Sequence, residues 1–226
     1  MAVSSSSPLL IWLSPAFPIG SFAFSHGLEW AHDAGDVTDY ESCHAWLQDL
    51  LSFGTGHQDA VLLAATWRAA SANDIDALRA VIELAGAMHP SAERHLEAHM
   101  QGKAFMAMIH AAWSNETLAM FAQILPKDVT YPVAVGLAAA AHEIALPVVL
   151  ESFLIALLSS WVSASIRLGV IGQTDGQKLI AALLPRLRLV SERAEKSTLD
   201  DLGSCAFRSD LASLHHETQY TRLFRS

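Results

Sequence analysis

Residues 151–167 read ESFLIALLSSWVSASIR, an almost unbroken apolar stretch with one charged residue at each end. Between Glu151 and Arg167 no residue is charged, but residues 152–166 fall short of the roughly 18 residues that a membrane-spanning helix needs. The stretch therefore predicts a helix that is buried in a protein core and ends near Gly169. We expect no membrane partner from it.

Helix signals continue in both directions from this core helix. Upstream, Pro147 separates it from a helix that begins at Tyr131-Pro132, where a proline suits the first turn. Thr38 and Glu41 have the spacing of a capping box, in which each side chain binds a free backbone N–H of the first turn. Further start and stop signals predict helices over about 58–70, 74–88, 91–113 and 115–125.

Downstream, Thr174 and Gln177 form a second capping-box pattern. It predicts a helix over about 175–196, with a kink at Pro185 because proline cannot donate the helical hydrogen bond. No alternating strand pattern bounded by turn signals occurs. We therefore predict an all-α fold, a single-domain helical bundle of about eight to ten helices over residues 1–226, with a flexible N-terminal segment (about 1–8) and a partner-binding C-terminal tail (about 197–226).

The composition restricts the function classes. Of 226 residues, 52% are hydrophobic and only 16% are charged, so the apolar surplus must enter a core or a partner interface, and we expect a homodimer. A net charge of −9 disfavours nucleic acid and anionic membranes as partners. Cys43 and Cys205 are too few for a disulfide scaffold, which indicates a reducing, cytoplasmic location.

Residues 14–29 break the helical pattern. Two prolines and Gly20 fix an irregular turn, and three phenylalanines, Phe17, Phe22 and Phe24, crowd into eight residues. A rigid loop that displays aromatic rings is suited to protein docking, because aromatic side chains anchor interface cores. The alternative is that the rings only cover the end of the bundle.

Residues 167–178 superficially resemble a phosphate-binding loop. Gly172 and Gly176 have the wrong spacing, and no strand precedes them, so we do not expect the chain itself to bind a nucleotide. The polar Gln173, Asp175 and Gln177 could instead present a hydrogen-bonding face to a partner. An ordinary turn between helices explains the same residues, with Arg167 as a favourable charge at a helix C-terminus.

The last twelve residues, 215–226, combine apolar and cationic side chains. Tyr220, Leu223 and Phe224 alternate with Arg222 and Arg225, whereas frayed ends are usually polar and featureless. We expect this segment to lie outside the bundle core and to become ordered on a partner.

Eleven histidines raise the question of a metal site. His95 and His99 are spaced i and i+4 on a predicted helix, with His89 upstream, so their rings can share one face. The pattern is not HExxH, and we predict no catalytic residue, cofactor site or metal ligand. A helical metal-dependent enzyme or metal carrier that uses His95 and His99 remains the rival hypothesis.

Four segments in one order resemble the UreF family of urease accessory proteins. They are residues 14–29, Tyr131-Pro132-Val133-Ala134-Val135-Gly136, Gly172-Gln173-Thr174-Asp175-Gly176-Gln177 and residues 216–224. The resemblance implies an all-helical, dimeric, non-enzymatic adaptor without a cofactor. It also implies binding to a UreD-type (or UreH-type) protein and to the nickel-binding UreG-type GTPase, in an assembly that inserts nickel into apo-urease, with modulation of the GTPase step.

The same resemblance assigns the candidate positions. Arg167 stands where the family carries a basic residue before its turn, Arg222 matches an arginine of the family's tail, and Phe22 occupies a position that can be tyrosine in relatives. The partner-binding candidates from the motifs and the resemblance together are Phe17, Pro18, Gly20, Phe22, Ser25, Gly27, Glu29, Arg167, Gln173, Asp175, Gln177, His216, Glu217, Tyr220, Arg222, Leu223 and Phe224.

Overall fold

The apolar stretch around residue 155 forms the long helix α9, Leu146–Arg167, in a computed structural model that describes residues 6–226. One side of α9 carries large side chains that are themselves fully buried, among them Phe153, Leu158 and Trp161. Within the described residues α9 is the one helix long and apolar enough to cross a membrane, a property that core helices share. Its buried side packs mainly against α10 and α4.

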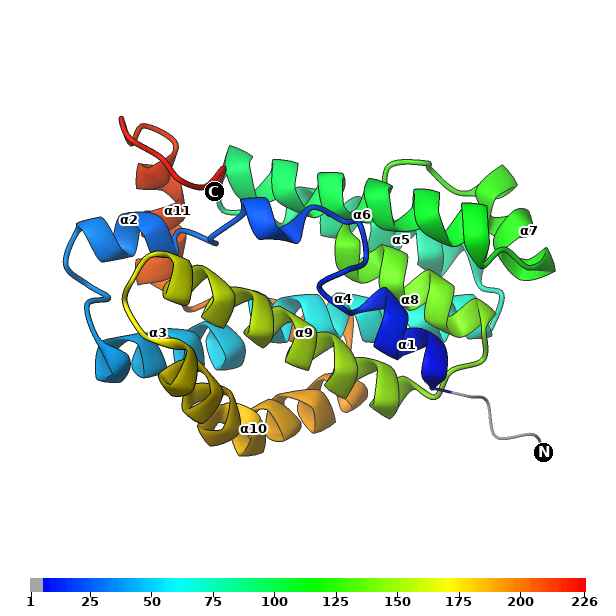
Figure 1. Ribbon diagram of the computed structural model, residues 1–226. Coiled ribbons are helices and arrows are strands. Elements are labelled where there is room, and N and C mark those ends of the chain that lie inside the picture. The colour runs from blue at the N-terminus through cyan, green and yellow to red at the C-terminus, as the bar shows by residue number, and fades with distance from the viewer. Residues whose placement is uncertain (1–5) are drawn as a thin grey trace.

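The other described elements are also helical, and no strand occurs between residues 6 and 226, so the all-α bundle is confirmed (Figure 1). Their bounds are α1 Ser7–Trp12, the 3₁₀ helix η1 Ser21–Ala23, α2 Leu28–Asp33, α3 Tyr40–Phe53, α4 Thr55–Ser71, α5 Ile75–Ala87, α6 Ala92–Ala112, α7 Glu116–Ile124, α8 Tyr131–Ala141, α10 Gln173–Lys196, η2 Leu199–Asp201 and α11 Phe207–His216.

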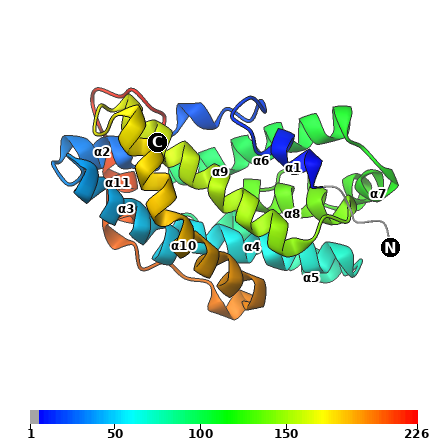
Figure 2. The same cartoon turned by 60° about the horizontal axis from the view of Figure 1, so that its bottom comes forward.

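The centre of the bundle is α8, which packs against both α4 and α6 (Figures 1 and 2). All its residues from Tyr131 to Ala140 are buried, because alanine, valine and glycine let the neighbouring helices approach closely. A Cβ atom on Gly136 would lie 2.9 Å from the Leu63 carbonyl oxygen of α4. Small residues therefore set the distance between these helices.

Three predicted helix starts are confirmed at the level of the capping atoms. The side chains of Asp74, Ser91 and Asn115 accept hydrogen bonds from backbone N–H groups at 3.0, 3.2 and 2.9 Å, three residues further along the chain. Each helix begins where its cap residue predicted. Pro132 and Pro147 lie in the first turns of α8 and α9, and Pro185 lies inside α10, which changes direction near its middle in Figure 1.

Both predicted capping boxes are wrong in detail. At α3 the box is formed one residue later, because the Asp39 carboxylate accepts from Ser42 N–H at 2.9 Å and Ser42 Oγ accepts from Asp39 N–H at 3.1 Å. At α10 the helix begins at Gln173 after Gly172, so Thr174 lies within the first turn and caps nothing. The helix expected over 58–70 likewise begins at Thr55.

The two chain ends differ from the expected simple segments. Of the N-terminal segment expected over about 1–8, residues 1–5 lie outside the described residues, and Ser7 and Pro8 belong to α1. The segment after Lys196 contains η2 and the ten-residue helix α11, which packs against α2 and α6. A regular helix therefore occupies part of what the sequence indicated as a tail.

We predict that Gly102→Ala strongly destabilises the bundle. A Cβ atom at this α6 position would lie 2.0 Å from the Val129 carbonyl oxygen and 2.9 Å from Tyr131 N. Because backbone atoms cannot give way as a flexible side chain can, we expect a loss of about 3 kcal/mol or more in the free energy of unfolding. Chemical denaturation followed by circular dichroism measures it.

The matched control is Gly86→Ala in α5, where a Cβ atom would meet nothing closer than 3.8 Å. That variant should be unchanged or up to about 1 kcal/mol more stable, since alanine favours helix over glycine. Equal stability of the two variants would disprove the close packing of α6 on residues 129–131.

Candidate functional site

The loop of residues 14–29 is shaped by glycines that no other residue could easily replace. Gly20 and Gly27 have φ angles of +76° and +77°, the left-handed region that disfavours side chains. A Cβ atom on Gly27 would also lie 2.9 Å from the backbone nitrogen of Ser213 in α11. Gly27 thus brings the start of α2 into contact with the C-terminal helix.

Glu29 is the point where this loop holds the C-terminal segment. Its side chain is buried, and its carboxylate accepts hydrogen bonds from the backbone N–H groups of Leu223 and Phe224, the latter at 2.8 Å. The same carboxylate lies 3.1 Å from His216 Nε2. A buried charge is tolerated only when it is fully hydrogen-bonded, and the C-terminal segment supplies those donors.

His216 connects Glu29 to a second carboxylate. Its ring is fully buried, and its Nδ1 lies 2.7 Å from Glu93, which also receives a hydrogen bond from Arg222 at 2.7 Å. His216 and Arg222 therefore meet at the Glu93 carboxylate, and His216 links that carboxylate to Glu29.

Glu97 forms a third buried centre beside the first two. It accepts hydrogen bonds from Ser226 Oγ at 3.0 Å, from Gln101 at 2.9 Å and from the Arg94 guanidinium. Burial raises the pKa of Glu97, and Arg94 and these hydrogen bonds partly offset that rise.

His26, from the N-terminal loop, also meets Arg94. Burial, followed by the nearby Arg94 charge, holds the pKa of His26 well below its usual value. The neutral ring accepts a hydrogen bond from Arg94 at Nδ1, so its 3.1 Å contact with Glu97 is not an ion pair. The backbone closes the same region, since Ser25 N–H donates to the Ser226 oxygen at 2.7 Å and Arg225 N–H to the Ala23 oxygen at 2.8 Å.

Arg167 brings three of the predicted segments together. Its guanidinium lies 3.4 Å from the centroid of the Phe22 ring and 4.2 Å from that of Phe224, and it donates to the Phe22 carbonyl oxygen. Arginine over aromatic faces gains a cation–π attraction. Phe22 is 69% exposed, whereas Phe224 is buried.

The structure contradicts one premise about the C-terminal segment. We expected its apolar side chains to lie outside the core, but Phe224 is only 4% exposed and His216 is fully buried. The reason is electrostatic, because Glu29, Glu93 and Glu97 need donors that this segment supplies. Tyr220 and Leu223 are exposed as expected.

The remaining candidate residues fall into two groups. Glu217 accepts a hydrogen bond from Ala92 N–H at 2.7 Å and so caps the start of α6, and Phe17 is buried against Phe105. Pro18 lies in the exposed part of the N-terminal loop. Gln173 and Gln177 are exposed at the start of α10, next to Asp175, which pairs with Lys178 at 2.9 Å.

A groove of about 520 Å³ runs beside Phe22, between the N-terminal loop and α9. Apolar side chains such as Leu10 and Ile155 line it, and Arg167 lies at its edge. We did not predict this groove. The available signal was the row of small residues on one face of α9, Ser152, Ala156, Ser159, Ser160 and Ser163.

A second surface, on α11, was also missed. Its members share the spacing i, i+4 and i+7, and each is at least 46% exposed: Phe207, Leu211 and Leu214. We call these three residues the α11 stripe. An apolar stripe on a helix normally faces a core, so an exposed one indicates a place for another protein.

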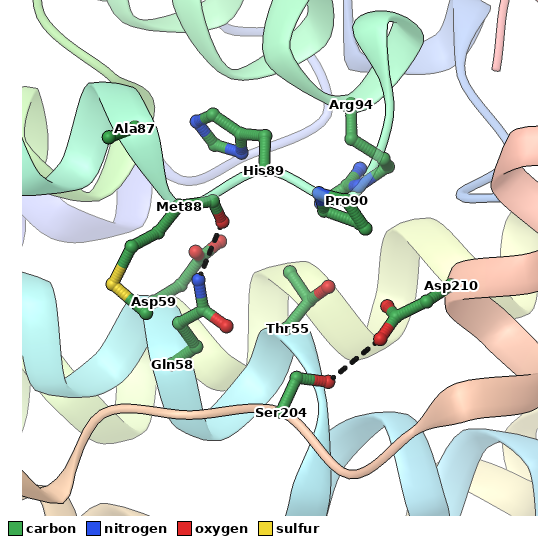
Figure 3. A pocket seen from close by; sticks show the side chains of 10 residues that line it. All are labelled: Thr55, Gln58, Asp59, Ala87, Met88, His89, Pro90, Arg94, Ser204 and Asp210. Carbon is green, nitrogen blue, oxygen red and sulfur yellow. Dashed lines mark hydrogen bonds between the residues drawn. The ribbon is translucent and has the colours of Figure 1, made fainter.

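A polar pocket of about 240 Å³ lies between α4, the segment before α6 and the segment before α11 (Figure 3). Asp59 lies there, where burial and the nearby Glu97 raise its pKa and Arg94 lowers it, for a net rise to about 7. Gln58 donates to the Met88 carbonyl oxygen at 2.8 Å, and Ser204 donates to Asp210 at 3.3 Å. Asp59 can therefore exchange a proton near neutral pH.

His95 and His99 lie on α6 with ring centroids 4.3 Å apart, and His89 lies beside them. They are separate from the contacts around Glu29.

Comparison with known proteins gives one consistent result. A family model described as UreF matches residues 37–184. Similar curated proteins include "Urease accessory protein UreF" of Rhodopseudomonas palustris (strain HaA2), 53% identical over 218 residues, which cover 96% of this chain and 92% of that protein. The proteins of the same name from Azorhizobium caulinodans and Xanthobacter autotrophicus are 48% and 50% identical, over 100% and 97% of this chain and 97% and 90% of their own lengths.

We predict that Phe224→Ala destabilises the chain and Tyr220→Ala does not. Phe224 packs in the core beside Arg167, whereas Tyr220, four residues earlier, is completely exposed. Truncating a buried phenylalanine costs about 3 kcal/mol, and an exposed side chain costs less than about 0.5 kcal/mol. Thermal melting compares the two variants, and equal melting temperatures would show that the segment does not pack as described.

We predict that Asp59→Asn alters how stability depends on pH. The pKa of Asp59 rises from 3.8 to about 7 on folding, so the native state binds more protons and stability falls as pH increases across that interval. The variant should exceed the parent in stability at pH values above 7, and its advantage should shrink toward pH 4. Denaturation across pH tests it, with the exposed Asp49→Asn in α3 as the control; parallel curves for all three proteins would contradict it.

Proposed function

The chain belongs to the UreF family of urease accessory proteins, and on this basis we propose that it acts in urease maturation as a non-enzymatic cytoplasmic adaptor. In this role it binds a UreD-type (or UreH-type) protein and a UreG-type GTPase, and through them reaches apo-urease during nickel insertion. It modulates the GTPase step without binding the nucleotide itself.

The observation that carries this proposal is the exposure of apolar side chains on well-packed segments. Tyr220 is completely exposed and Leu223 is 60% exposed, although their neighbours His216 and Phe224 are buried. The neighbouring contacts therefore anchor the backbone of this segment and leave the two side chains uncovered. Because that backbone is already ordered, binding a partner costs less conformational entropy than ordering a free tail would.

Two separate apolar surfaces support an adaptor with more than one partner. The groove beside Phe22 is lined by α9 and the N-terminal loop, and the α11 stripe comes from the C-terminal helix. They share no residue. The same apolar excess supports self-association, so we propose that the adaptor is a homodimer.

The polar centres around Glu29 support a positioning role for five of the partner-binding candidates. Ser25, Gly27, Glu29, His216 and Arg222 lie among these contacts, and none of them offers an exposed apolar surface. They hold the loop and the C-terminal segment in register, and the exposed Phe22, Tyr220 and Leu223 touch the partner.

The proposal predicts that Tyr220→Ala combined with Leu223→Ala disrupts the accessory complex without unfolding the chain. The exposed side chains contribute interface area and little to the fold, so the melting temperature should stay the same while capture of the UreD-type protein falls at least tenfold. Pull-down with the purified UreD-type and UreG-type proteins measures capture. Urease activity in cells that carry the urease genes but lack this chain's own gene measures the consequence, and should fall with capture.

The control is Met120→Ala on α7, an exposed apolar residue at the end of the bundle away from α11 (Figure 1). It should leave both capture and urease activity unchanged. Full capture by the double variant would remove Tyr220 and Leu223 from the interface. Full urease activity in cells without the chain would overturn the adaptor function.

A further inference from the structure

Three histidines converge where α5 gives way to α6. His95 and His99 lie one turn apart on α6, and His89 comes from the connecting segment, so one potential ligand nitrogen from each lies within 4.8 Å of the others. The ring centroid of His89 lies 5.5 and 6.2 Å from those of His95 and His99.

One nitrogen of each of the two α6 histidines is held by a neighbouring group. His99 Nδ1 lies 2.9 Å from the Asp128 carboxylate, and His95 Nδ1 lies 3.2 Å from the Gly86 carbonyl oxygen. When Nδ1–H donates to an acceptor, the lone pair that can bind a metal is at Nε2, and this is the arrangement that outer-shell groups impose on histidine ligands.

Two nitrogens of this cluster are unsatisfied. Nε2 of His89 and Nε2 of His99 are buried and have no hydrogen-bond partner within the described structure. An unpaired buried polar atom is costly, and lone pairs that face each other cannot satisfy one another. A cation among them would satisfy all three nitrogens.

From this geometry we propose that His89, His95 and His99 bind one divalent transition-metal ion of the zinc, cobalt or nickel type through their Nε2 atoms. Neutral imidazoles are the ligands these ions prefer, and three of them leave a fourth position for water. His95 is exposed and provides the entry path from solvent. Two nitrogens that each bind one ion at roughly 2.0–2.1 Å lie at most about 4.2 Å apart, so any pair near the 4.8 Å limit would approach through small rotations of the rings.

The position of the cluster also fits this assignment. The ion would join the segment before α6 to α6 itself, with Asp128 before α8 as the outer support. The site is independent of the adaptor function, which needs none of these residues.

The experiment is a titration of the full chain, without an affinity tag, with Co²⁺ and then with Zn²⁺. We expect one ion per chain, a visible Co²⁺ spectrum that Zn²⁺ abolishes, and a rise in melting temperature on Zn²⁺ addition. His89→Gln and His99→Gln should each weaken binding at least tenfold. Asp128→Asn removes no ligand and should still weaken binding about tenfold, because it frees the His99 ring.

The matched control is His110→Gln, an exposed histidine further along the same helix, which should bind as the parent does. Equal weakening by His110→Gln, or unchanged affinity in both His89→Gln and His99→Gln, would overturn the site. Neither outcome of the metal titration bears on whether Tyr220 and Leu223 bind the accessory partners, which the pull-down tests. The metal site and the adaptor function can therefore be disproved independently.

Discussion

The Glu29 carboxylate is buried near one end of the bundle, and the far end of the chain supplies the donors of its hydrogen bonds. Backbone N–H groups of Leu223 and Phe224 and the ring of His216 meet it, and Glu93 and Glu97 nearby impose the same requirement on Arg222 and Ser226. Removing one partner from such a network leaves the other as an unpaired buried charge, which strongly destabilises the folded chain. The position of the C-terminal segment, the contact of Phe224 with Arg167 and the exposure of Tyr220 all follow from this constraint.

The hydrophobic core and the polar network have different tasks in this fold. Small residues on α8 and Gly102 on α6 let the central helices approach to backbone distance, which fixes their spacing without any charged group. The network lies to one side, where the N-terminal loop, the start of α6 and α11 meet. Packing thus forms the bundle, and buried ionic contacts specify how two distant segments are joined on it.

Local signals in the sequence predicted the helices well because each depends on a few neighbouring residues. Asp74, Ser91 and Asn115 cap the expected helices, since an N-cap acts through N–H groups only two or three positions away. The predicted cap at Thr38 was wrong because two possible acceptors, Thr38 and Asp39, are adjacent, and the Asp39 carboxylate is the one that caps α3. Glu29 was identified by resemblance, but its partners lie almost two hundred residues away, and no periodicity or spacing reports a contact of that range. The groove on α9 and the α11 stripe were not predicted for another reason. The spacing of their apolar residues is the same whether that face of the helix contacts the core or a partner.

The pairing of Ser25 with Ser226 gives the order of synthesis a structural meaning. The two residues are 201 positions apart. At the usual pace of translation, about 5–20 residues per second, the loop around Ser25 waits roughly 10–40 s for its partner to leave the ribosome. Most of the helical body can form during that interval, while Glu29 and Phe22 are still without their final neighbours. A chain interrupted within α11 would therefore contain nearly the whole bundle but lack the surface that the N-terminal loop and the C-terminal segment form together. That surface can be complete only after the last residues of these contacts have been synthesised.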